Sequence, residues 1–486
     1  MASEAIRARR LHPLTLIFET IRIARHLVLP ALAGAISATD DGVARAAAVG
    51  FGILAIPAIL AAIARYVSFR FHVTDDELIL DSGVFSRRRR IIPLSRIQNV
   101  DVRQKALERI CGVASLLIET AGGKTTEGVL SVLDRAEADA LRTRLLASRS
   151  GVAPDYATPV ETLARLSTRD LVVAGATANE IGLVAAALLS VFQAVQDSLV
   201  QRILDAIDST ALDSLPAGLA LAGFIVAGAV ALLLAGWLLS IGGAVIGYHG
   251  FTLERVGDEL RKRYGLFARR EGSVPRRRVQ AIRIEESLMR RPFGLAAVRI
   301  ETAGSAVTGR RRHPEAFVPL VRRDEVAPLV ARVLEGFDPD GVTLLPVHPR
   351  TRRRIFARLA AVIVALTAAL ALLHHPGWLA SLVLLVPADA LARNAYANRR
   401  YAILDDYVVV RVALLGRTTW IIPRRKIQTV HVASSPFQRR HGLATLIVDT
   451  ASGPRGAARI RDLPLEVARE LADRLSAPMP GPAPVR

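Results

Sequence analysis

The sequence predicts an α+β membrane protein with six transmembrane helices in three hairpins, each hairpin followed by a compact β domain that ends in one amphipathic helix. Three observations support this fold class: a pattern of about thirty residues that occurs three times, apolar stretches before each occurrence, and a change of hydrophobic period inside each occurrence. The chain has 486 residues, which is room for about three ordinary domains, and 51% of them are hydrophobic although only 5% are aromatic. This composition is more apolar than that of a typical soluble protein.

The repeated pattern is anchored on a proline, which is Pro93, Pro275 or Pro423. A basic residue lies three positions after each proline, and the other shared residues follow at fixed distances without any gap. They are Gln98, Gln280 and Gln428 at position five, Arg109, Arg291 and Arg439 at sixteen, Gly112, Gly294 and Gly442 at nineteen, and Thr120, Thr302 and Thr450 at twenty-seven. Since this unit is much longer than a solenoid repeat, each copy is expected to be a small domain.

The segments between the copies are long and apolar. Residues 46–64 and 215–248 contain no charged residue, and each is long enough to cross a hydrocarbon core of roughly 30 Å. Weaker spans lie near 21–38, 171–192 and 377–391, so that each copy is preceded by two spans. The expected boundaries are transmembrane hairpins at 1–66, 165–247 and 350–395, β domains at 67–149, 248–336 and 396–477, and a flexible tail at 478–486.

The charges predict the orientation of the protein in the membrane. An even number of spans before each copy places all three copies on one side. The stretches after each pair of spans are rich in arginine, whereas the turns within the pairs are acidic or uncharged. We therefore expect a multi-pass protein of the bacterial cytoplasmic membrane. By the positive-inside rule, its N-terminus and its three β domains are expected on the cytoplasmic side.

Within the first copy, apolar residues alternate along several short segments, and an Asp-Asp pair supplies a turn between the first two. The period then changes after Asp134, a good helix cap, because Ala136, Leu141 and Leu145 fall on one helical face. The other two copies end in similar amphipathic segments. Each copy is therefore expected to be a β domain of about 80 residues that is closed by one helix.

The chain resembles the bacterial pleckstrin-homology-like, membrane-flanked family (bPH2) over essentially its whole length, in three copies. The resemblance is carried by a two-span hairpin, an aromatic residue leading a strand, "IP…RIQ…V", R-x-x-G and "TAG". The resemblance implies a pleckstrin-homology-like β barrel capped by a C-terminal helix, and it implies little about biochemistry. The third copy departs from the pattern with "TASG" and "GRTTW", and the second lacks the paired isoleucines before its proline.

The shared residues have a structural and a functional interpretation. In the structural one, which we favour, the proline opens a strand at an edge, the glutamine bonds to neighbouring backbone, and the glycine takes a positive φ in a turn. In the functional one, the proline–glutamine segment is a strand that contacts a ligand.

Runs of arginine are candidate contacts for lipid headgroups, at about 1 kcal/mol for each residue near an anionic leaflet. They are Arg87, Arg88, Arg89, Arg90, Arg310, Arg311, Arg312, Arg352, Arg353 and Arg354. The alternative is a solvated face that obeys the topology rule. The copies share a fold pattern but not the basic run, which argues against a phosphoinositide pocket common to all three. Glu180 and Asp389 are either intramembrane carboxylates or markers of the ends of spans.

Several function classes find no support in the sequence. The net charge is +20, but nearly all the basic residues are arginines spread along the chain without interleaved aromatics, so no nucleic-acid partner is expected. The single cysteine, Cys111, rules out a disulfide within the chain and a cysteine-rich zinc site. No hydrolase, metalloprotease or nucleotide-binding motif is present, so we expect no enzyme activity, no cofactor and no metal. No cleavable signal peptide is apparent.

The leading hypothesis is an integral membrane scaffold that displays three cytoplasmic modules for protein–protein assembly, because tethered copies raise effective concentration and exposed sheet edges are natural pairing sites. The expected partners are membrane lipid and other chains, in a homo- or hetero-oligomer. The resemblance implies a smaller membrane protein with a single module as the partner. The alternatives are a transporter or channel component that uses the six helices, and a sensor of anionic lipid.

Overall fold

The computed structural model describes residues 11–18, 20, 59–60, 62–64, 66–83, 86–120, 128–150, 160–178, 217–302, 317–339, 341–373, 378–452 and 457–477. They form two compact units, Met1–Val160 with Arg261–Val274 and Glu161–Leu260 with Pro275–Arg486. The boundary passes through the second repeat, because its segment Arg261–Val274, which ends just before Pro275, belongs to the first unit.

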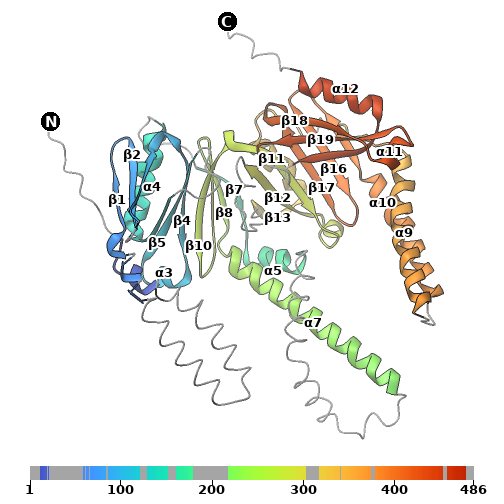
Figure 1. Cartoon of the computed structure of the whole chain (residues 1–486), viewed down its shortest axis with the longest axis horizontal. Helices are drawn as coiled ribbons and strands as arrows, with labels where there is room; N and C mark the ends of the chain where they lie inside the picture. Colours follow the sequence, from blue (N-terminus) through green and yellow to red (C-terminus); the bar gives the residue numbers. More distant parts are fainter. Residues whose placement is uncertain are drawn as a thin grey trace, which may run out of the picture. The chain divides into compact units, whose positions relative to one another are not determined.

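The first repeat consists of two antiparallel meanders that enclose one core (Figure 1). Phe71, Leu78 and Ile92 of one meander pack with Leu116 and Leu130 of the other, and all five are almost completely buried. The last helix packs against the second meander. The elements are β1 (Arg70–Val73), β2 (Glu77–Ser82), β3 (Arg88–Pro93), η1 (Leu94–Arg96), β4 (Ile97–Gln104), α3 (Ala106–Ile110), β5 (Val113–Thr120), β6 (Gly128–Asp134) and α4 (Arg135–Ser150).

The second repeat has the same order of strands, with a 3-10 turn in place of α3, and the described residues before it form one strand and two helices. These are β7 (Val160–Arg165), α5 (Thr168–Ala176) and α7 (Ala217–Tyr248). The repeat itself contains β8 (Thr252–Val256), β9 (Glu259–Tyr264), β10 (Arg269–Pro275), η2 (Arg276–Arg278), β11 (Val279–Glu286), η3 (Arg291–Phe293), β12 (Leu295–Thr302), β13 (Val318–Arg322) and α8 (Arg323–Val333).

The third repeat again has two meanders around one core, which includes Val408, Ile422, Leu446 and Leu475. Its strands are rich in β-branched residues, as in "YVVVRVA" of β16, and such residues favour a pleated, half-buried surface. The elements are β14 (Leu345–Pro346), α9 (Arg350–Leu372), η4 (Leu379–Leu384), α10 (Leu385–Ala397), β15 (Arg400–Ile403), β16 (Tyr407–Ala413), β17 (Arg417–Pro423), η5 (Arg424–Lys426), β18 (Ile427–Ala433), α11 (Pro436–Arg439), β19 (Leu443–Thr450), β20 (Ala458–Pro464) and α12 (Leu465–Ser476).

The prediction of six transmembrane helices in three hairpins is wrong. Among the described residues, two helical segments are long and apolar enough to cross a membrane, Val230–Tyr248 and Arg350–Leu372. The expected span near 377–391 is instead a six-residue 3-10 helix followed by α10, and Asp389 of α10 forms ion pairs with Arg352 at 3.0 Å and Arg393. Neither piece has the length of a span.

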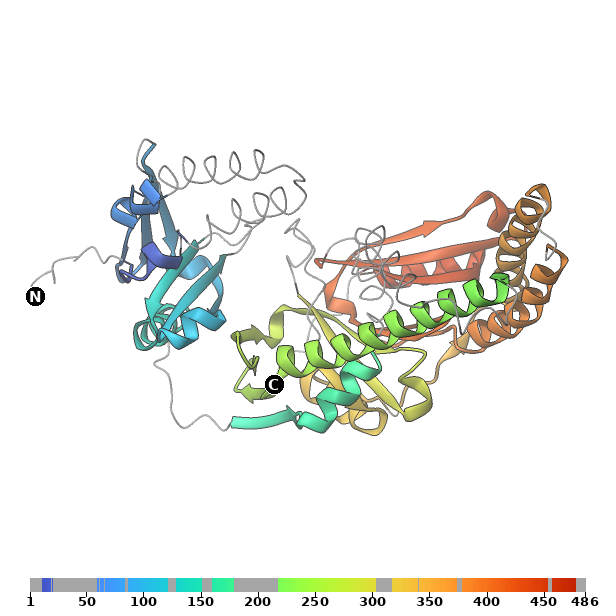
Figure 2. The same ribbon diagram turned by 90° about the horizontal axis from the view of Figure 1, so that it is seen from below.

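The other predicted spans fall largely outside the described residues. This holds for most of the hairpin at 1–66 and for the part of the span near 171–192 that contains Glu180. The part that is described is α5, which ends at Ala176 and packs against α7 (Figure 2). Gly175 permits this close approach, because a Cβ there would lie 2.6 Å from the Cα of Ile241. Trp237 also donates a hydrogen bond to the carbonyl of Ala176 at 3.1 Å.

The prediction of three separate β barrels also needs correction, because the sheets are open and strands of neighbouring repeats pair with each other. In the first unit, β4 of the first repeat pairs with β10 of the second. In the second unit, β11 of the second repeat pairs with β17 of the third. An unpaired strand edge exposes a row of backbone N–H and C=O groups, and pairing between repeats satisfies them.

Candidate functional site

We call the β4–β10 pairing the first junction and the β11–β17 pairing the second junction. Both are antiparallel, and both have the same register relative to the repeated proline. The residue six positions before the proline lies opposite the residue eleven positions after the proline of the preceding repeat. These opposite pairs are Arg269 with Gln104 and Arg417 with Glu286. One module therefore adds a strand to the next in the same register at both junctions.

The second junction contains a buried ion pair. Nε and Nη2 of Arg417 donate to the two carboxylate oxygens of Glu286, and each side chain is 7% exposed. Arg323 of α8 lies 4.0 Å from the same carboxylate. Two-point contact with a carboxylate fixes geometry as well as charge, and loss of either partner would leave the other charge buried.

A second group of charges lies along the same junction. Arg283 stacks over the ring of Trp420 on the opposite strand, at 5.1 Å from the ring centroid. It also lies 2.9 Å from Glu285, which accepts a hydrogen bond from Arg299 at 2.7 Å. Burial raises the pKa of Glu301 above its ordinary value, although Arg283 and Arg299 act in the opposite direction.

The first junction uses a different arrangement of charge. Glu271 of β10 lies 3.0 Å from both Arg135 and Arg269, 3.5 Å from Arg263 and 3.9 Å from Arg142. Its side chain is 14% exposed, whereas those of Arg135 and Arg269 are about twice as exposed. One carboxylate therefore neutralises part of a four-arginine cluster next to the paired strands.

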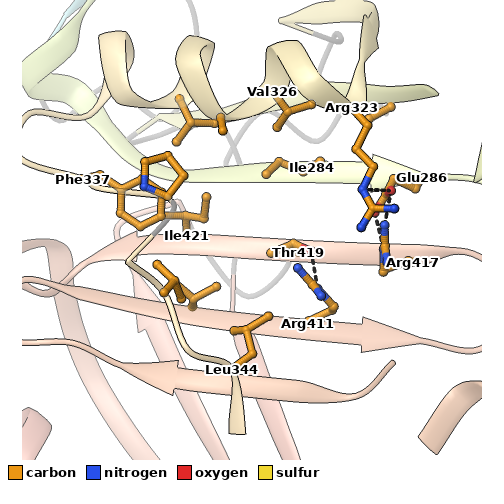
Figure 3. Close-up of a pocket in the computed structure, with 16 residues that line it drawn as sticks. Ile284, Glu286, Arg323, Val326, Phe337, Leu344, Arg411, Arg417, Thr419 and Ile421 are labelled. Atoms are coloured by element: carbon orange, nitrogen blue, oxygen red, sulfur yellow. Dashed lines mark hydrogen bonds and ion pairs between the residues drawn. The ribbon is translucent and has the colours of Figure 1, made fainter. Parts of the chain in front are cut away.

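A cavity of about 190 Å³ lies beside the second junction, between α8 and the strands. Figure 3 shows apolar side chains such as Val326, Phe337 and Ile421 along it, while Arg411 and Arg417 gather at one end. Burial, followed by the nearby charge of Arg417, lowers the pKa of Arg411 to about 10. The shape suits a short apolar chain with an anionic end, although it is smaller than the roughly 300–1,000 Å³ of pockets for drug-sized ligands.

The repeated prolines form the same turn three times. Pro93, Pro275 and Pro423 end β3, β10 and β17 with φ of −60°, −61° and −61°, and each is followed by a 3-10 turn. The next residue donates its N–H to the carbonyl of an aspartate in the preceding hairpin: Leu94 to Asp76, Arg276 to Asp258 and Arg424 to Asp406, at 2.7–2.9 Å. The fixed φ of proline suits this bend.

The repeated glutamines occupy irregular positions of the strands that follow. In each repeat the strand register shifts across the glutamine, between Ile97 and Asn99, Val279 and Ala281, or Ile427 and Thr429. Gln280 is buried and donates to the carbonyl of Arg278 at 3.1 Å, whereas Gln428 is exposed. The side chain of Gln98 is outside the described part of the chain. The glutamine thus marks a bulge, a feature that bends strands at sheet edges.

The repeated arginines reach toward the next repeat where one exists. Arg109 donates to the carbonyl of Leu266, and Arg291 donates to Asn394 of α10 at 3.0 Å and to Asn398, the C-cap of that helix, at 3.1 Å. Arg439 of the last repeat instead donates to the carbonyl of Ser434 in its own repeat, at 3.3 Å. This difference follows the position of each repeat in the chain.

The repeated glycines have a special backbone conformation, and the repeated threonines lie in paired strands. The glycines take left-handed φ of +70°, +63° and +64°, and the threonines lie opposite the first residue after each 3-10 turn. Gly112, Gly294 and Gly442 each donate to the carbonyl of the repeated arginine at 3.1–3.2 Å. Such turns favour glycine because it has no Cβ.

The candidate lipid-contacting arginines are divided among different surroundings. Arg87–Arg90 are exposed, and Arg89 lies 3.8 Å from Asp81. Arg310–Arg312 are outside the described residues. Arg352 pairs with Asp389, Arg354 pairs with Asp462, and Arg353 is exposed. In the part of the chain that the structure describes, no cluster of three or more histidine, cysteine or acidic side chains is arranged to hold a metal ion.

Glu286, Arg417 and Arg411 are not among the candidate residues predicted from the sequence. A signal for one of them is present, because arginine stands six positions before the proline in all three repeats, at Arg87, Arg269 and Arg417. Extending the repeat alignment backward would have found it. Nothing in the pattern predicts Glu286, since the equivalent positions hold Gln104 and Ser434.

Comparison with known proteins agrees with the repeat structure. The family described as bacterial PH domain matches at residues 26–149, 214–336 and 354–479. The chain is 25% identical over 474 residues to the UPF0699 transmembrane protein YdbT of Bacillus subtilis, covering 91% of this chain and 93% of that protein. It is 35% identical over 78 residues to the UPF0699 transmembrane protein YdbS of the same organism, covering 16% of this chain and 47% of that protein.

No solved structure matches the chain. The transmembrane relative and the two long apolar helices make this a membrane protein. The three matches span most of the sequence, with one in each of the repeats that the proline pattern defines. The chain therefore belongs to the bacterial PH domain family, in three consecutive copies.

Proposed function

We propose that this protein is a non-enzymatic scaffold of the bacterial cytoplasmic membrane, which binds other proteins through its PH domains. The observation that carries the proposal is the pairing of modules edge to edge at two junctions with one register. Backbone pairing between strands gives affinity, and side chains at the junction give specificity. A module that pairs in this way within one chain is suited to pair with modules of other chains.

The proposed partner is a smaller membrane protein with one module of the same kind. The similarity of the chain to YdbS, over a stretch of one module's length, supports this choice because family members of small size exist. Three modules on one chain raise the effective concentration at which further modules meet.

The test is extraction of the tagged full-length chain from its native membrane in lipid nanodiscs, followed by mass measurement and identification of bound proteins. We expect a second protein in fixed stoichiometry with the chain. Recovery of a single chain with lipid alone, at several nanodisc sizes, would contradict the scaffold. The same preparation without the tagged chain is the control for nonspecific recovery.

The proposal places the PH domains in the cytoplasm, and the single cysteine allows a direct measurement. Cys111 is exposed and lies between β4 and β5 of the first repeat. A membrane-impermeant maleimide should label it in inverted membrane vesicles but not in intact spheroplasts, and Cys111→Ser should remain unlabelled in both. Labelling in spheroplasts would place the module on the outer side.

A second candidate function is sensing of anionic amphiphiles, which the cavity beside the second junction favours. Its apolar wall and the desolvated Arg411 match an acyl chain with a carboxylate or phosphate. Octanoate titrated against the full-length chain should raise the thermal transition, and Arg411→Gln should remove that shift. No shift for octanoate and octyl phosphate alike would exclude this candidate. Because the cavity is small, we place this function after the scaffold.

A further inference from the structure

At each junction one strand of the earlier repeat, β4 or β11, pairs with the third strand of the following repeat, and we call this strand of the earlier repeat the receiving strand. The last repeat has a strand that corresponds to these two. Counted from the proline, β18 is the equivalent of β4 and β11, and Ser434 is the equivalent of Gln104 and Glu286. Within the described residues β18 pairs on one side, with β19, and it is the end strand of its sheet. It occupies the position at which β4 and β11 each receive a strand from the following repeat.

The side chains of β18 are those of an open edge. Thr429, His431 and Ala433 are exposed and Val432 is 37% exposed, whereas most of β11 is buried. Natural proteins protect exposed edges with lysine, inward charges, proline or bulges. Along β18 the one irregularity in the pairing with β19 is at Gln428, at its start, and the strand contains no lysine, arginine, aspartate, glutamate or proline. The strand is therefore ready to pair.

The repeated arginine gives a second, independent sign of a missing neighbour. Arg109 and Arg291 contact residues that follow their own repeat, namely Leu266 and the asparagines at the C-terminal end of α10. Arg439 of the third repeat instead bonds to Ser434, the residue beside which an added strand would begin. Both the strand edge and the arginine of the last repeat lack what the first two repeats have.

We propose that β18 receives the third strand of a PH domain that belongs to a separate chain. The residue six positions before the proline of that domain would lie opposite Ser434, as Arg269 and Arg417 lie opposite Gln104 and Glu286. The proposal rests on the scaffold function and names the surface and the partner strand that the function uses.

The basic residues of β3 and those beside β18 disfavour a second copy of this chain as the partner. In the first repeat the strand equivalent to β10 and β17 is β3, which is also an end strand of its sheet in the described residues. Arg88, Arg89 and Arg90 within it and Arg87 just before it make it strongly basic. β18 is itself bordered by Arg425 and Lys426 at one end and by Arg439 and Arg440 at the other. Because like charges brought together oppose pairing, the partner strand should carry fewer arginines or an acidic residue, as β10 carries Glu271.

The experiment places a photo-crosslinking benzoylphenylalanine at Val432 of the full-length chain and irradiates native membranes. Val432 is nine positions after its proline, and its counterpart Val102 lies opposite Glu271, four positions before the next proline. We therefore expect a cross-link to the residue about four positions before the proline of a PH domain in a different chain. The same probe at Val129, an exposed valine on the edge strand β6, is the matched control and should not give that product.

Val432→Lys provides the functional arm, with Val129→Lys as its control. We expect Val432→Lys to lower the recovery of the bound partner about tenfold, the change that follows from loss of about 1.4 kcal/mol at an interface position, and Val129→Lys to leave recovery unchanged. Cross-linking of Val432 to lipid or to a second copy of this chain would overturn the proposal. A stoichiometric partner that ignores Val432→Lys would overturn it while leaving the scaffold function intact, and absence of any protein partner would end both.

Discussion

The two junctions share a register but differ in how they place charge. At the second junction a single arginine–glutamate pair, Arg417 with Glu286, is buried directly between the paired strands. At the first junction the equivalent residues are Arg269 and Gln104, and the carboxylate is on the other strand of the pair, at Glu271 of β10, two positions after Arg269, where several partly exposed arginines surround it. The register is thus a property of the backbone and its turns, whereas the charges vary from one junction to the next.

The largest effect is expected at the second junction. Glu286→Ala should lower the free energy of unfolding of the second unit by about 3–5 kcal/mol, because it leaves Arg417 buried without its carboxylate. Chemical unfolding followed by hydrogen exchange on β17 measures the change. The double variant Glu286→Leu with Arg417→Met should recover most of the loss, and equal instability of the double and single variants would show that the pair is not the cause.

A smaller effect is expected at the first junction. Glu271→Gln should cost about 1 kcal/mol, because Arg135 and Arg269 remain partly solvated and surface pairs contribute little. The loss should shrink in 0.5 M salt, since partly exposed charges are screened. If Glu271→Gln destabilises the first unit as much as Glu286→Ala destabilises the second, the contrast between a buried pair and a solvated cluster fails.

The repeated arginines give a comparison within one residue type. Arg291→Lys should cost about 1 kcal/mol and increase hydrogen exchange in α10, because lysine cannot hold Asn394 and Asn398 with two arms. Arg439→Lys should change stability by less than about 0.5 kcal/mol, since its side chain bonds to the carbonyl of Ser434 at an exposed part of its own repeat. Equal losses for the two variants would mean that the arginine serves the turn and not the neighbouring element.

The smallest effect on folding is expected at the open edge. Val432→Lys should change the free energy of unfolding by less than about 0.5 kcal/mol, because the side chain is already exposed. The equivalent change in the second repeat, Ile284→Lys, should cost more than about 2 kcal/mol, because that strand is paired on both sides and its side chain lines the cavity. Thermal unfolding of both variants in nanodiscs measures the difference, and similar losses would show that β18 is covered in the free protein.

The repeated pattern could be recognised in the sequence because each of its residues fixes a local backbone feature. Pro275 has the φ of the turn after β10, Gly294 takes a left-handed φ, and both features are the same in every copy. The ion pair of Glu286 with Arg417 could not be read, because its partners are 131 residues apart and only one of them recurs in the other repeats.

The membrane spans were the least successful part of the prediction. Hydropathy alone made residues 377–391 resemble a transmembrane helix, whereas Asp389 pairs with Arg352 of the neighbouring helix and Leu379–Leu384 form a 3-10 helix. A window of apolar residues does not distinguish a helix that spans a bilayer from one that packs beside such a helix.

The sequence by itself determined that this protein has three copies of one bacterial PH domain, where each copy turns, and that long apolar helices accompany them. These features depend on side-chain types at fixed spacing, which a single chain displays directly. Only the tertiary structure decided that the copies join through strand edges, at one register, and that β18 is left as an edge. Edge pairing is made by backbone N–H and C=O groups, which every residue except proline carries alike, so the sequence holds almost no record of which edge meets which.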